Sequence, residues 1–282
     1  MEYIELENGY KVPIIGYGTL HIPPKQAKDC VTKALLSGYR LIDTAAAYLN
    51  EKEIGQALKE VDIPRSEIVL TTKVWIQDGG YENTMKAFER SLTNLQVDYI
   101  DIYLIHQPYG DYYGSWKAME ELYKQGKVKV IGVCNFSPER FVDLWMNSTI
   151  HPMINQIEHH PFYQRDSFNC ILKQYHCQLE AWGPLNEGQR DIFNHPLLAK
   201  IANKYHKSIA QIILRWHIEN KILVIPKTIN EERMKENIEV FDFELDEEDK
   251  DIIKELDMGY SEIIDHQNYM TAKWLNSYKI HD

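Results

Sequence analysis

Short β-rich runs alternate with helix-period segments along the whole chain. Eight runs read as strands: Ile14–Tyr17, Arg40–Ile42, Ile68–Leu70, Tyr99–Ile105, Val128–Val133, Met153–Ile157, Gln178–Trp182 and Ile222–Ile225. Amphipathic stretches lie between them, including Lys25–Ser37, Tyr81–Leu95, Gly114–Lys124, Pro138–Met146, Ser167–Tyr175 and Pro196–His217. Strand then helix, repeated eight times, predicts an α/β fold with a parallel sheet closed as a (β/α)8 TIM barrel. A doubly wound open sheet is the competing architecture.

Two additions fall outside the eight units. Asn8-Gly9 between two short strands is a type I′ hairpin signal, and this hairpin would cap the bottom of the barrel. An acidic segment, Asp246–Leu256, reads as an additional C-terminal helix. No Pro/Gly/Ser-rich linker interrupts the chain, so residues 1–282 are predicted to form a single domain. The sequence leaves open whether the aromatic tail that follows packs outside the fold or folds over its mouth.

Charge and cysteine content exclude several classes of partner. The formal charge of -11 disfavours nucleic acid and anionic membranes. No apolar run reaches the length of a spanning helix, and the start lacks a basic and apolar leader, so we expect neither a membrane span nor a signal peptide. The four cysteines have no Cys-x-x-Cys spacing, which is typical of a cytoplasmic protein. His151, His159 and His160 complete no ligand set, so no metal is expected.

Four polar residues lie where the predicted strands end, which is where barrels carry their chemistry. Asp43 ends the second strand, Tyr48 lies in the loop after it, Lys73 follows the third strand and His106 the fourth. An ammonium beside a phenol would lower the pKa of Tyr48, and a carboxylate would keep Lys73 charged, making Tyr48 a usable general acid. Singly, these residues could be a helix cap, a surface lysine and a core histidine. Their joint placement favours a catalytic site.

At least a dozen short motifs in order resemble those of the aldo-keto reductases, from about residue 4 to about residue 260. They include Gly16-Tyr17-Gly18-Thr19, Asp43-Thr44-Ala45, Thr71-Thr72-Lys73-Val74-Trp75, Gly132-Val133-Cys134-Asn135-Phe136, Asn155-Gln156, Trp182-Gly183-Pro184-Leu185 and Ile225-Pro226-Lys227-Thr228. The chain is most similar to short bacterial members such as 2,5-diketo-D-gluconate reductase. The glycines of Gly16-Tyr17-Gly18 lack the third glycine of a Rossmann fingerprint, so that kind of cofactor site is not supported.

The resemblance implies NADPH-dependent reduction of aldehydes or ketones to alcohols. Its catalytic tetrad falls on Asp43, Tyr48, Lys73 and His106, with Tyr48 as the proton donor and His106 orienting the carbonyl. Trp182 matches the residue that stacks on the nicotinamide, Asn135 and Gln156 match its carboxamide contacts, and Lys227, Thr228 and Arg233 match the contacts of the 2′-phosphate. The implied cofactor contacts are Thr19, Asn135, Gln156, Trp182, Leu185, Lys227, Thr228, Arg233, Glu236 and Asn237.

Three positions depart from the family pattern. Cys134 and Gly183 stand where serine is frequent, which weakens a carboxamide contact and puts a pyrophosphate contact in doubt. Leu20 replaces a bulky aromatic and changes the substrate pocket. The candidate substrate contacts are Tyr17, Leu20, Trp75, Tyr109 and Trp116, all expected on loops at the mouth.

Two other functions stay open at this point. A Schiff-base aldolase would use Lys73 as its nucleophile, although nothing would then explain Lys227, Arg233, Asn135 and Gln156. An NADPH-binding sensor or accessory subunit would have little turnover. The expected protein is a cytoplasmic monomer whose partner is a small carbonyl substrate.

Overall fold

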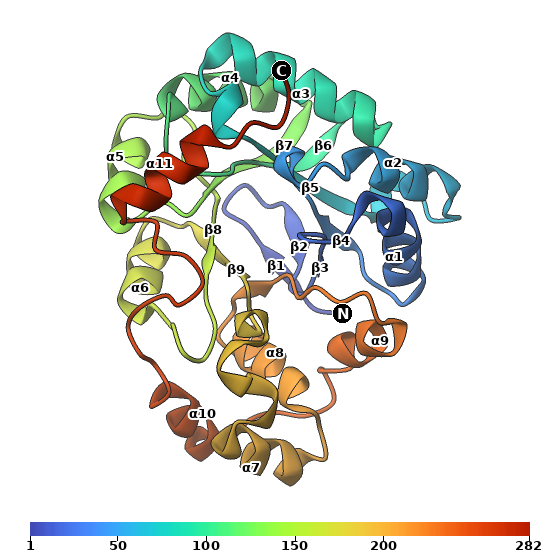
Figure 1. The fold of residues 1–282 in the computed structure, drawn as a ribbon, viewed down its shortest axis with the longest axis vertical. Helices are drawn as coiled ribbons and strands as arrows, with labels where there is room; N and C mark the ends of the chain where they lie inside the picture. The colour runs from blue at the N-terminus through green and yellow to red at the C-terminus, as the bar shows by residue number, and fades with distance from the viewer.

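Eight parallel strands form the centre of the molecule. The structure, a computed structural model, describes residues 1–282. The strands are β3 (Tyr17–Gly18), β4 (Leu41–Asp43), β5 (Val69–Val74), β6 (Ile100–Ile105), β7 (Val128–Cys134), β8 (Ile154–Glu158), β9 (Gln178–Trp182) and β10 (Leu223–Val224), and they pair in chain order. A parallel bridge between Ile15 and Val224 joins the two ends of the sheet. The predicted barrel is therefore confirmed, and the open sheet is not observed (Figure 1).

Helices surround the strands (Figure 1). They are α1 (Pro24–Leu36), α2 (Glu51–Glu60), α3 (Tyr81–Leu95), α4 (Tyr112–Lys124), α5 (Pro138–Met146), α6 (Asp166–Gln174), α7 (Pro196–Tyr205), α8 (Ile209–Glu219), α9 (Glu231–Ile238), α10 (Glu247–Lys254) and α11 (Tyr269–Ser277). Because helices cover the outer face and side chains fill the inner one, every residue of β6 is buried. The main core is one cluster of 55 buried residues.

The segment predicted as one helix from Pro196 to His217 is two helices in the structure. α7 ends at Tyr205, and the next residue, His206, adopts a left-handed conformation with φ of 54°. α8 begins with a capping box, in which the Ser208 hydroxyl accepts from the Gln211 backbone N–H and the Gln211 side chain accepts from the Ser208 N–H. The capping pair Ser208 and Gln211 marks a new helix start, but it lies within a continuous helical pattern of apolar residues, so the prediction missed it.

The N-terminal hairpin closes the amino-terminal end of the barrel, as predicted. β1 (Tyr3–Glu5) pairs antiparallel with β2 (Lys11–Pro13). Asn8 donates to the carbonyl of Lys129, and the hydroxyl of Tyr10 donates to Asp101, so the hairpin contacts the starts of β7 and β6. The predicted type I′ turn is wrong: Gly9 N–H bonds to Leu6 O and only Gly9 has a positive φ, which fits a three-residue loop with a glycine bulge.

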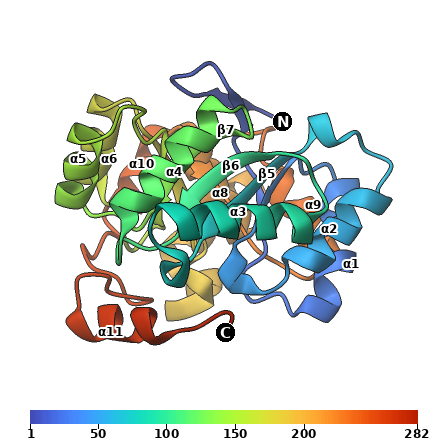
Figure 2. The ribbon, with the colours of Figure 1, turned by 90° about the horizontal axis from the view of Figure 1, so that it is seen from above.

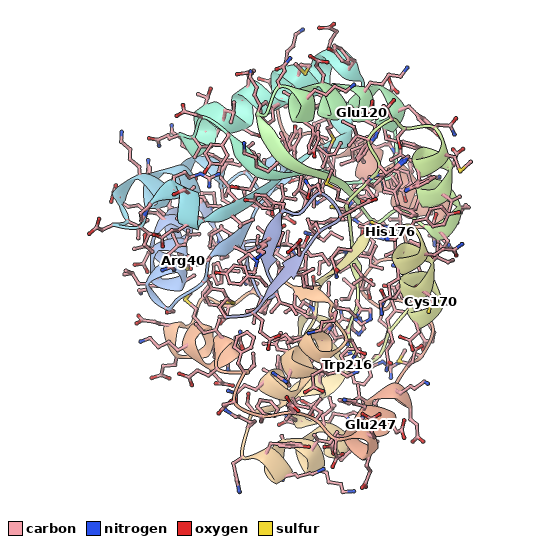
Figure 3. All side chains as sticks on the ribbon, turned by 180° about the vertical axis from the view of Figure 1, so that it is seen from behind. Arg40, Glu120, Cys170, His176, Trp216 and Glu247 are labelled. Atoms are coloured by element: carbon pink, nitrogen blue, oxygen red, sulfur yellow. The ribbon has the colours of Figure 1, made fainter.

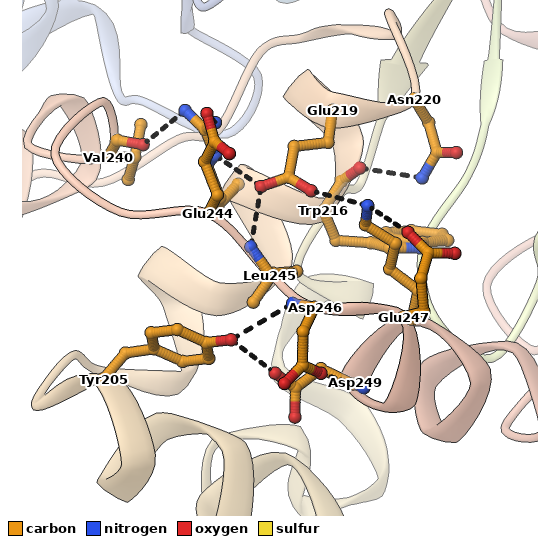
Figure 4. Close-up of polar contacts among 12 residues, drawn as sticks. Tyr205, Trp216, Glu219, Asn220, Val240, Glu244, Leu245, Asp246, Glu247 and Asp249 are labelled. Atoms are coloured by element: carbon orange, nitrogen blue, oxygen red, sulfur yellow. Dashed lines mark hydrogen bonds and ion pairs between the residues drawn. The ribbon is translucent and has the colours of Figure 1, made fainter.

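The additional C-terminal helix is α10, and it is tied to α7 and α8 by polar contacts (Figure 4). The hydroxyl of Tyr205 donates to Asp249 at 2.6 Å and accepts from the N–H of Asp246. Glu219 accepts from the N–H of Leu245 at 2.9 Å. A second apolar cluster of 11 buried residues lies between these helices. The acidic segment is therefore a docked helix with its own small core.

The tail after α10 crosses the carboxyl-terminal end of the barrel, opposite the hairpin (Figure 2). The hydroxyl of Tyr109 donates to the carbonyl of His266 at 2.5 Å. Beyond α11, the indole N–H of Trp75 donates to the carbonyl of Tyr278 at 2.9 Å, and His281 lies 3.0 Å from Asp78. Of the two paths that the sequence left open, the tail takes the one over the mouth.

The cysteines and the helices carry two further observations. All four cysteines are free thiols, and only Cys170, on α6, is exposed (Figure 3). None of the helices combines the length and the apolar character needed to cross a bilayer.

Candidate active site

Three strand ends and the turn after the first of them place the four predicted catalytic residues at one mouth. Asp43 is the last residue of β4, Lys73 is the penultimate residue of β5, and His106 directly follows β6. Tyr48 closes a single 3-10 turn, Ala46–Tyr48, that begins just beyond Asp43. Because parallel strands present their carboxyl ends at the same side of a barrel, the four side chains converge.

A buried ion pair lies at the centre of this group. The ammonium Nζ of Lys73 lies 2.6 Å from Asp43 Oδ1, 2.9 Å from the carbonyl of Thr44 and 3.5 Å from the hydroxyl of Tyr48. Lys73 is 0% exposed and Asp43 is 1% exposed. Burial opposes the ammonium form, but Asp43 and Tyr48 outweigh it and raise the pKa of Lys73. The site therefore holds a fixed positive charge beside the phenol.

The phenol of Tyr48 is protonated at neutral pH. Burial of its hydroxyl raises the pKa of Tyr48 above the ordinary value; Lys73 lowers it and Asp43 raises it further. Lys73 lowers the pKa as expected, but the expected net lowering is wrong for this structure, because the cost of burying a phenolate exceeds the help from one ammonium. A phenol that keeps its proton is the form that a proton donor requires.

His106 faces Tyr48 across the mouth. Its ring makes an edge contact with Tyr48, with ring centroids 5.4 Å apart, and another with Trp75 at 5.1 Å. Burial, Lys73 and His266 lower the pKa of His106 well below its ordinary value, so the ring is neutral. Its Nδ1 is buried without a hydrogen-bond partner. A neutral imidazole beside a phenol can orient a carbonyl oxygen without adding charge.

Three residues proposed to hold a nicotinamide lie next to this group. Asn135, with φ of 63°, donates to the carbonyl of His106 at 3.2 Å and accepts from the indole N–H of Trp182 at 2.8 Å. Gln156 donates through Nε2 to Asp43 Oδ2 at 2.9 Å. The thiol of Cys134 lies 3.9 Å from Gln156 Oε1. The side-chain amides of Asn135 and Gln156, which could hold a carboxamide, therefore form hydrogen bonds to the catalytic residues His106 and Asp43.

A second group of predicted cofactor residues lies after β10 and on α9. Lys227 and Arg233 are exposed, and neither has an acidic side chain within 4 Å. The backbone of Gly18 packs against this segment: its N–H donates to Pro226 O, and a Cβ at Gly18 would lie 2.7 Å from Ile225 O. A glycine is therefore needed for the close approach that joins this cation pair to the barrel.

The remaining cofactor candidates face inward to different degrees. Asn237 is buried and Glu236 is half-buried on α9, and Thr228 accepts from the hydroxyl of Tyr17 through its carbonyl. The hydroxyl of Thr19 donates to the carbonyl of Asp43 at 2.9 Å, and Leu185 packs against the second apolar cluster. The side chains of Thr19 and Leu185 thus have structural partners within the protein.

Two of the five substrate candidates are not at the mouth. Trp116 lies inside α4, is 2% exposed and donates from its indole to the carbonyl of Ile150, so it is a core residue. Tyr17 is 0% exposed in β3, where its ring packs on Tyr39. Both predictions are corrected, because each aromatic side chain packs into the protein interior instead of facing the mouth. Leu20, Trp75 and Tyr109 remain next to the mouth loops.

The sequence reasoning overlooked Glu180 and His266. Glu180 lies in β9, 0% exposed, and accepts from Gln156 Nε2 at 3.0 Å. A carboxylate between the apolar residues Leu179 and Ala181 of a strand was a visible signal. His266 belongs to the tail, where it lines a cavity of about 390 Å³ with Tyr109, Asn135 and Arg140. Its position depended on a path that no local pattern specified.

Comparison with known proteins finds similar sequences, similar structures and a matching family model. Glyoxal reductase of Bacillus subtilis (strain 168) is 44% identical over 255 residues, covering 90% of this chain and 92% of that protein. The crystal structure of MGS-M4, an aldo-keto reductase enzyme from a deep-sea metagenome library, is 46% identical with a TM-score of 0.92, covering 94% of this chain and 98% of that one. A Gox0644 mutant solved in complex with NADPH is 35% identical with a TM-score of 0.90, covering 99% and 98%. The model of the aldo/keto reductase family matches residues 14–258, and this chain belongs to that family.

Proposed function

We propose that the protein reduces aldehydes or ketones to alcohols with NADPH, and that Tyr48 is the general acid. The observation that carries the proposal is the chain of contacts from Asp43 through Lys73 to the hydroxyl of Tyr48, facing a neutral His106. Relatives named as reductases and neighbours solved with NADPH or NADP support it. The proposal treats residues 1–282 as one catalytic unit, a cytoplasmic monomer.

The residues fit a nicotinamide dinucleotide phosphate. Trp182 offers an aromatic face beside Asn135 and Gln156, and the free cations Lys227 and Arg233 suit a phosphate dianion. Bound there, NADPH supplies the hydride that reduces the carbonyl carbon. The chain would hold the ring at one end and the phosphate at the other, and such fixed orientation lowers a bimolecular barrier by several kcal/mol.

In this mechanism the protein supplies the proton and the setting for it. His106 orients the carbonyl oxygen toward the hydroxyl of Tyr48, which releases its proton as negative charge develops on that oxygen. The ammonium of Lys73 stabilises the phenolate that forms, because it lies 3.5 Å from the hydroxyl. Asp43 keeps Lys73 charged throughout. The phenol of Tyr48 is protonated when the cycle starts, and Lys73, which lowers its pKa, is the neighbour that eases release of the proton.

The decisive comparison is wild type against Tyr48→Phe with a panel of aldehydes, including glyoxal, at saturating NADPH. We expect a loss of about 100-fold to 10,000-fold in kcat, with NADPH binding retained. Tyr103→Phe, which removes a buried hydroxyl that has no hydrogen-bond partner, is the matched control. Equal rates for wild type and Tyr48→Phe would refute the mechanism. No NADPH oxidation by wild type would favour the sensor function.

The aldolase alternative has its own outcome. A Schiff base needs a neutral amine, whereas the pKa of Lys73 is raised: burial lowers it, but Asp43 and Tyr48 outweigh the burial. Borohydride treatment with a carbonyl substrate should therefore leave no adduct on Lys73. Mass spectrometry of the treated protein checks this point, and a trapped adduct would replace the reductase mechanism.

A further inference from the structure

The side-chain amide of Gln156 lies between two carboxylates inside the barrel. Its Nε2 is 2.9 Å from Asp43 Oδ2 and 3.0 Å from Glu180 Oε2. The strand register produces this arrangement, because Gln156 on β8 stands opposite Glu180 on β9 and opposite Cys134 on β7. All four side chains are buried.

Two carboxylates determine which way this amide points. An ionised carboxylate only accepts hydrogen bonds, so it attracts the NH2 group of an amide and repels its oxygen. Asp43 pairs with the ammonium of Lys73 at 2.6 Å and takes one N–H of Gln156, and Glu180 takes the second. Both donors of Gln156 are therefore used within the protein. Only its Oε1, which has the weak thiol donor of Cys134 at 3.9 Å, remains to accept a hydrogen bond from a ligand.

We propose that Glu180 is a positioning residue for the cofactor: together with Asp43 it fixes the plane of the Gln156 amide, so that Oε1 accepts from the NH2 group of the nicotinamide carboxamide. This inference rests on the proposed function. Asp43 alone would hold one N–H and leave the amide plane free to turn. Glu180 supplies the second contact, and so one side-chain amide joins the catalytic ion pair, through Nε2, to the cofactor contact, through Oε1.

The ionisation of Glu180 does not change this role. Burial first and Asp43 second raise the pKa of Glu180, Gln156 and Lys73 oppose the rise, and the net result is a pKa of about 7. The other titratable group facing this cluster is the thiol of Cys134, whose own pKa burial raises well above the ordinary value. When Glu180 binds a proton, its partnerless Oε1 can carry it while Oε2 still accepts from Gln156. The contact that orients the amide persists in both states.

The test measures binding of two dinucleotides that differ at the carboxamide. The probes are NADP⁺ and its 3-acetylpyridine analogue, in which a methyl ketone replaces the amide and the NH2 donor is lost. Titration of intrinsic tryptophan fluorescence gives each Kd without turnover. Wild type should prefer NADP⁺ by about tenfold, the effect of one hydrogen bond. In Glu180→Leu the preference should fall below about threefold, because Oε1 is no longer held in place.

Two variants separate positioning from general damage. Glu180→Gln keeps a side-chain oxygen that can accept from Gln156, so it should retain most of the preference for NADP⁺. Glu120→Gln alters a buried carboxylate on α4 that accepts from the N–H groups of Thr149 and Ile150 in the loop after α5, and it should leave the preference unchanged. If Glu180→Leu does not fold, Glu180→Met makes the same test with a flexible side chain.

The outcomes distinguish this inference from the proposed function. A folded Glu180→Leu or Glu180→Met that keeps the tenfold preference refutes the role of Glu180 alone. Equal loss in Glu180→Gln and Glu180→Leu also refutes it, because an acceptor oxygen would then be insufficient. Failure of wild type to bind NADP⁺ refutes the proposed cofactor and this inference with it. Tyr48→Phe should lose turnover while keeping the wild-type preference.

Discussion

Positive charge is held in opposite ways at the two ends of the proposed cofactor site. Lys73 is 0% exposed and lies 2.6 Å from its carboxylate partner. Lys227 and Arg233 are exposed and have no acidic partner within 4 Å. A buried charge must be paired within the fold, because an unpaired one costs several kcal/mol, whereas a solvated cation needs no partner.

This difference teaches which residues organise the site before a ligand arrives. The ion pair of Lys73 and Asp43 is part of the folded protein and is present without substrate. The exposed pair gains its partner only when an anion binds. Substitutions in the first group should therefore disturb stability together with chemistry, and substitutions in the second should disturb binding alone.

The largest effect is expected from Lys73→Met. Removing the ammonium leaves Asp43 buried without its cation, so the free energy of unfolding should fall by about 3–5 kcal/mol, with loss of reductase activity. Urea unfolding measures the first change. Lys235→Met is the matched control, because its salt bridge to Glu231 on α9 is exposed and worth less than about 1 kcal/mol. Equal stability of the two variants would contradict the distinction between the buried, paired cation and the exposed cations.

Arg233→Ala should affect binding of one dinucleotide only. We expect NADPH binding to weaken by about 1.5–3 kcal/mol, the contribution of a charge-assisted hydrogen bond, while NADH binding and thermal stability stay the same. Fluorescence titration with both cofactors checks the first point and a melting curve the second. Similar weakening for NADPH and NADH would remove the 2′-phosphate contact from the proposal.

Glu180→Gln should change how the free energy of unfolding depends on pH, which tests how burial acts on a charged group without its own cation. The pKa of Glu180 rises from 4.5 to about 7 on folding, mainly through burial, so between these values the folded state keeps a proton that the unfolded state has released. Wild-type stability therefore falls as pH rises through this window, and the variant lacks that loss. The variant-minus-wild-type unfolding free energy should increase by up to about 3 kcal/mol from pH 4.5 to pH 7. A difference independent of pH would contradict the assignment.

The smallest effect is expected from salt. Raising ionic strength from about 0.01 M to about 0.1 M shortens the screening length about threefold, which weakens exposed charge pairs far more than buried ones. NADPH binding should weaken several-fold while NADH binding changes little. Calorimetric titration at the two ionic strengths measures both. An equal response of the two cofactors would mean that Lys227 and Arg233 are not the salt-sensitive contacts.

The barrel could be predicted from the sequence because its signals are local and repeated. Strand runs such as Tyr99–Ile105 are apolar apart from Asp101, as burial on both faces requires, and helices such as α3 carry the matching period. The four strand-end residues followed from the fold, since parallel strands share one carboxyl end. The break at His206 was missed because a capping serine interrupts the helix without interrupting the apolar pattern.

The rest of the site depended on three-dimensional surroundings. The pKa of Tyr48 was mispredicted because the sequence shows its charged neighbours but not the burial that outweighs Lys73. The inward turn of Trp116 and Tyr17 depends on rotamers and neighbours far apart in the chain. The tail is held by single contacts, such as the hydrogen bond from Trp75 to Tyr278, and no hydrophobic periodicity in the sequence predicts such contacts.

The seam between Ile15 and Val224 has a consequence for motion. β3 and β10, the two shortest strands, flank this seam, whereas β6 and β7 share a long ladder. Short ladders open more readily, so the backbone amides of Gly16 and Val224 should exchange with deuterium faster than those of β6. Lys227 lies just beyond β10, so a dinucleotide held there would fasten the seam and slow that exchange. Local opening of the barrel at this seam and binding of the dinucleotide would then be thermodynamically coupled.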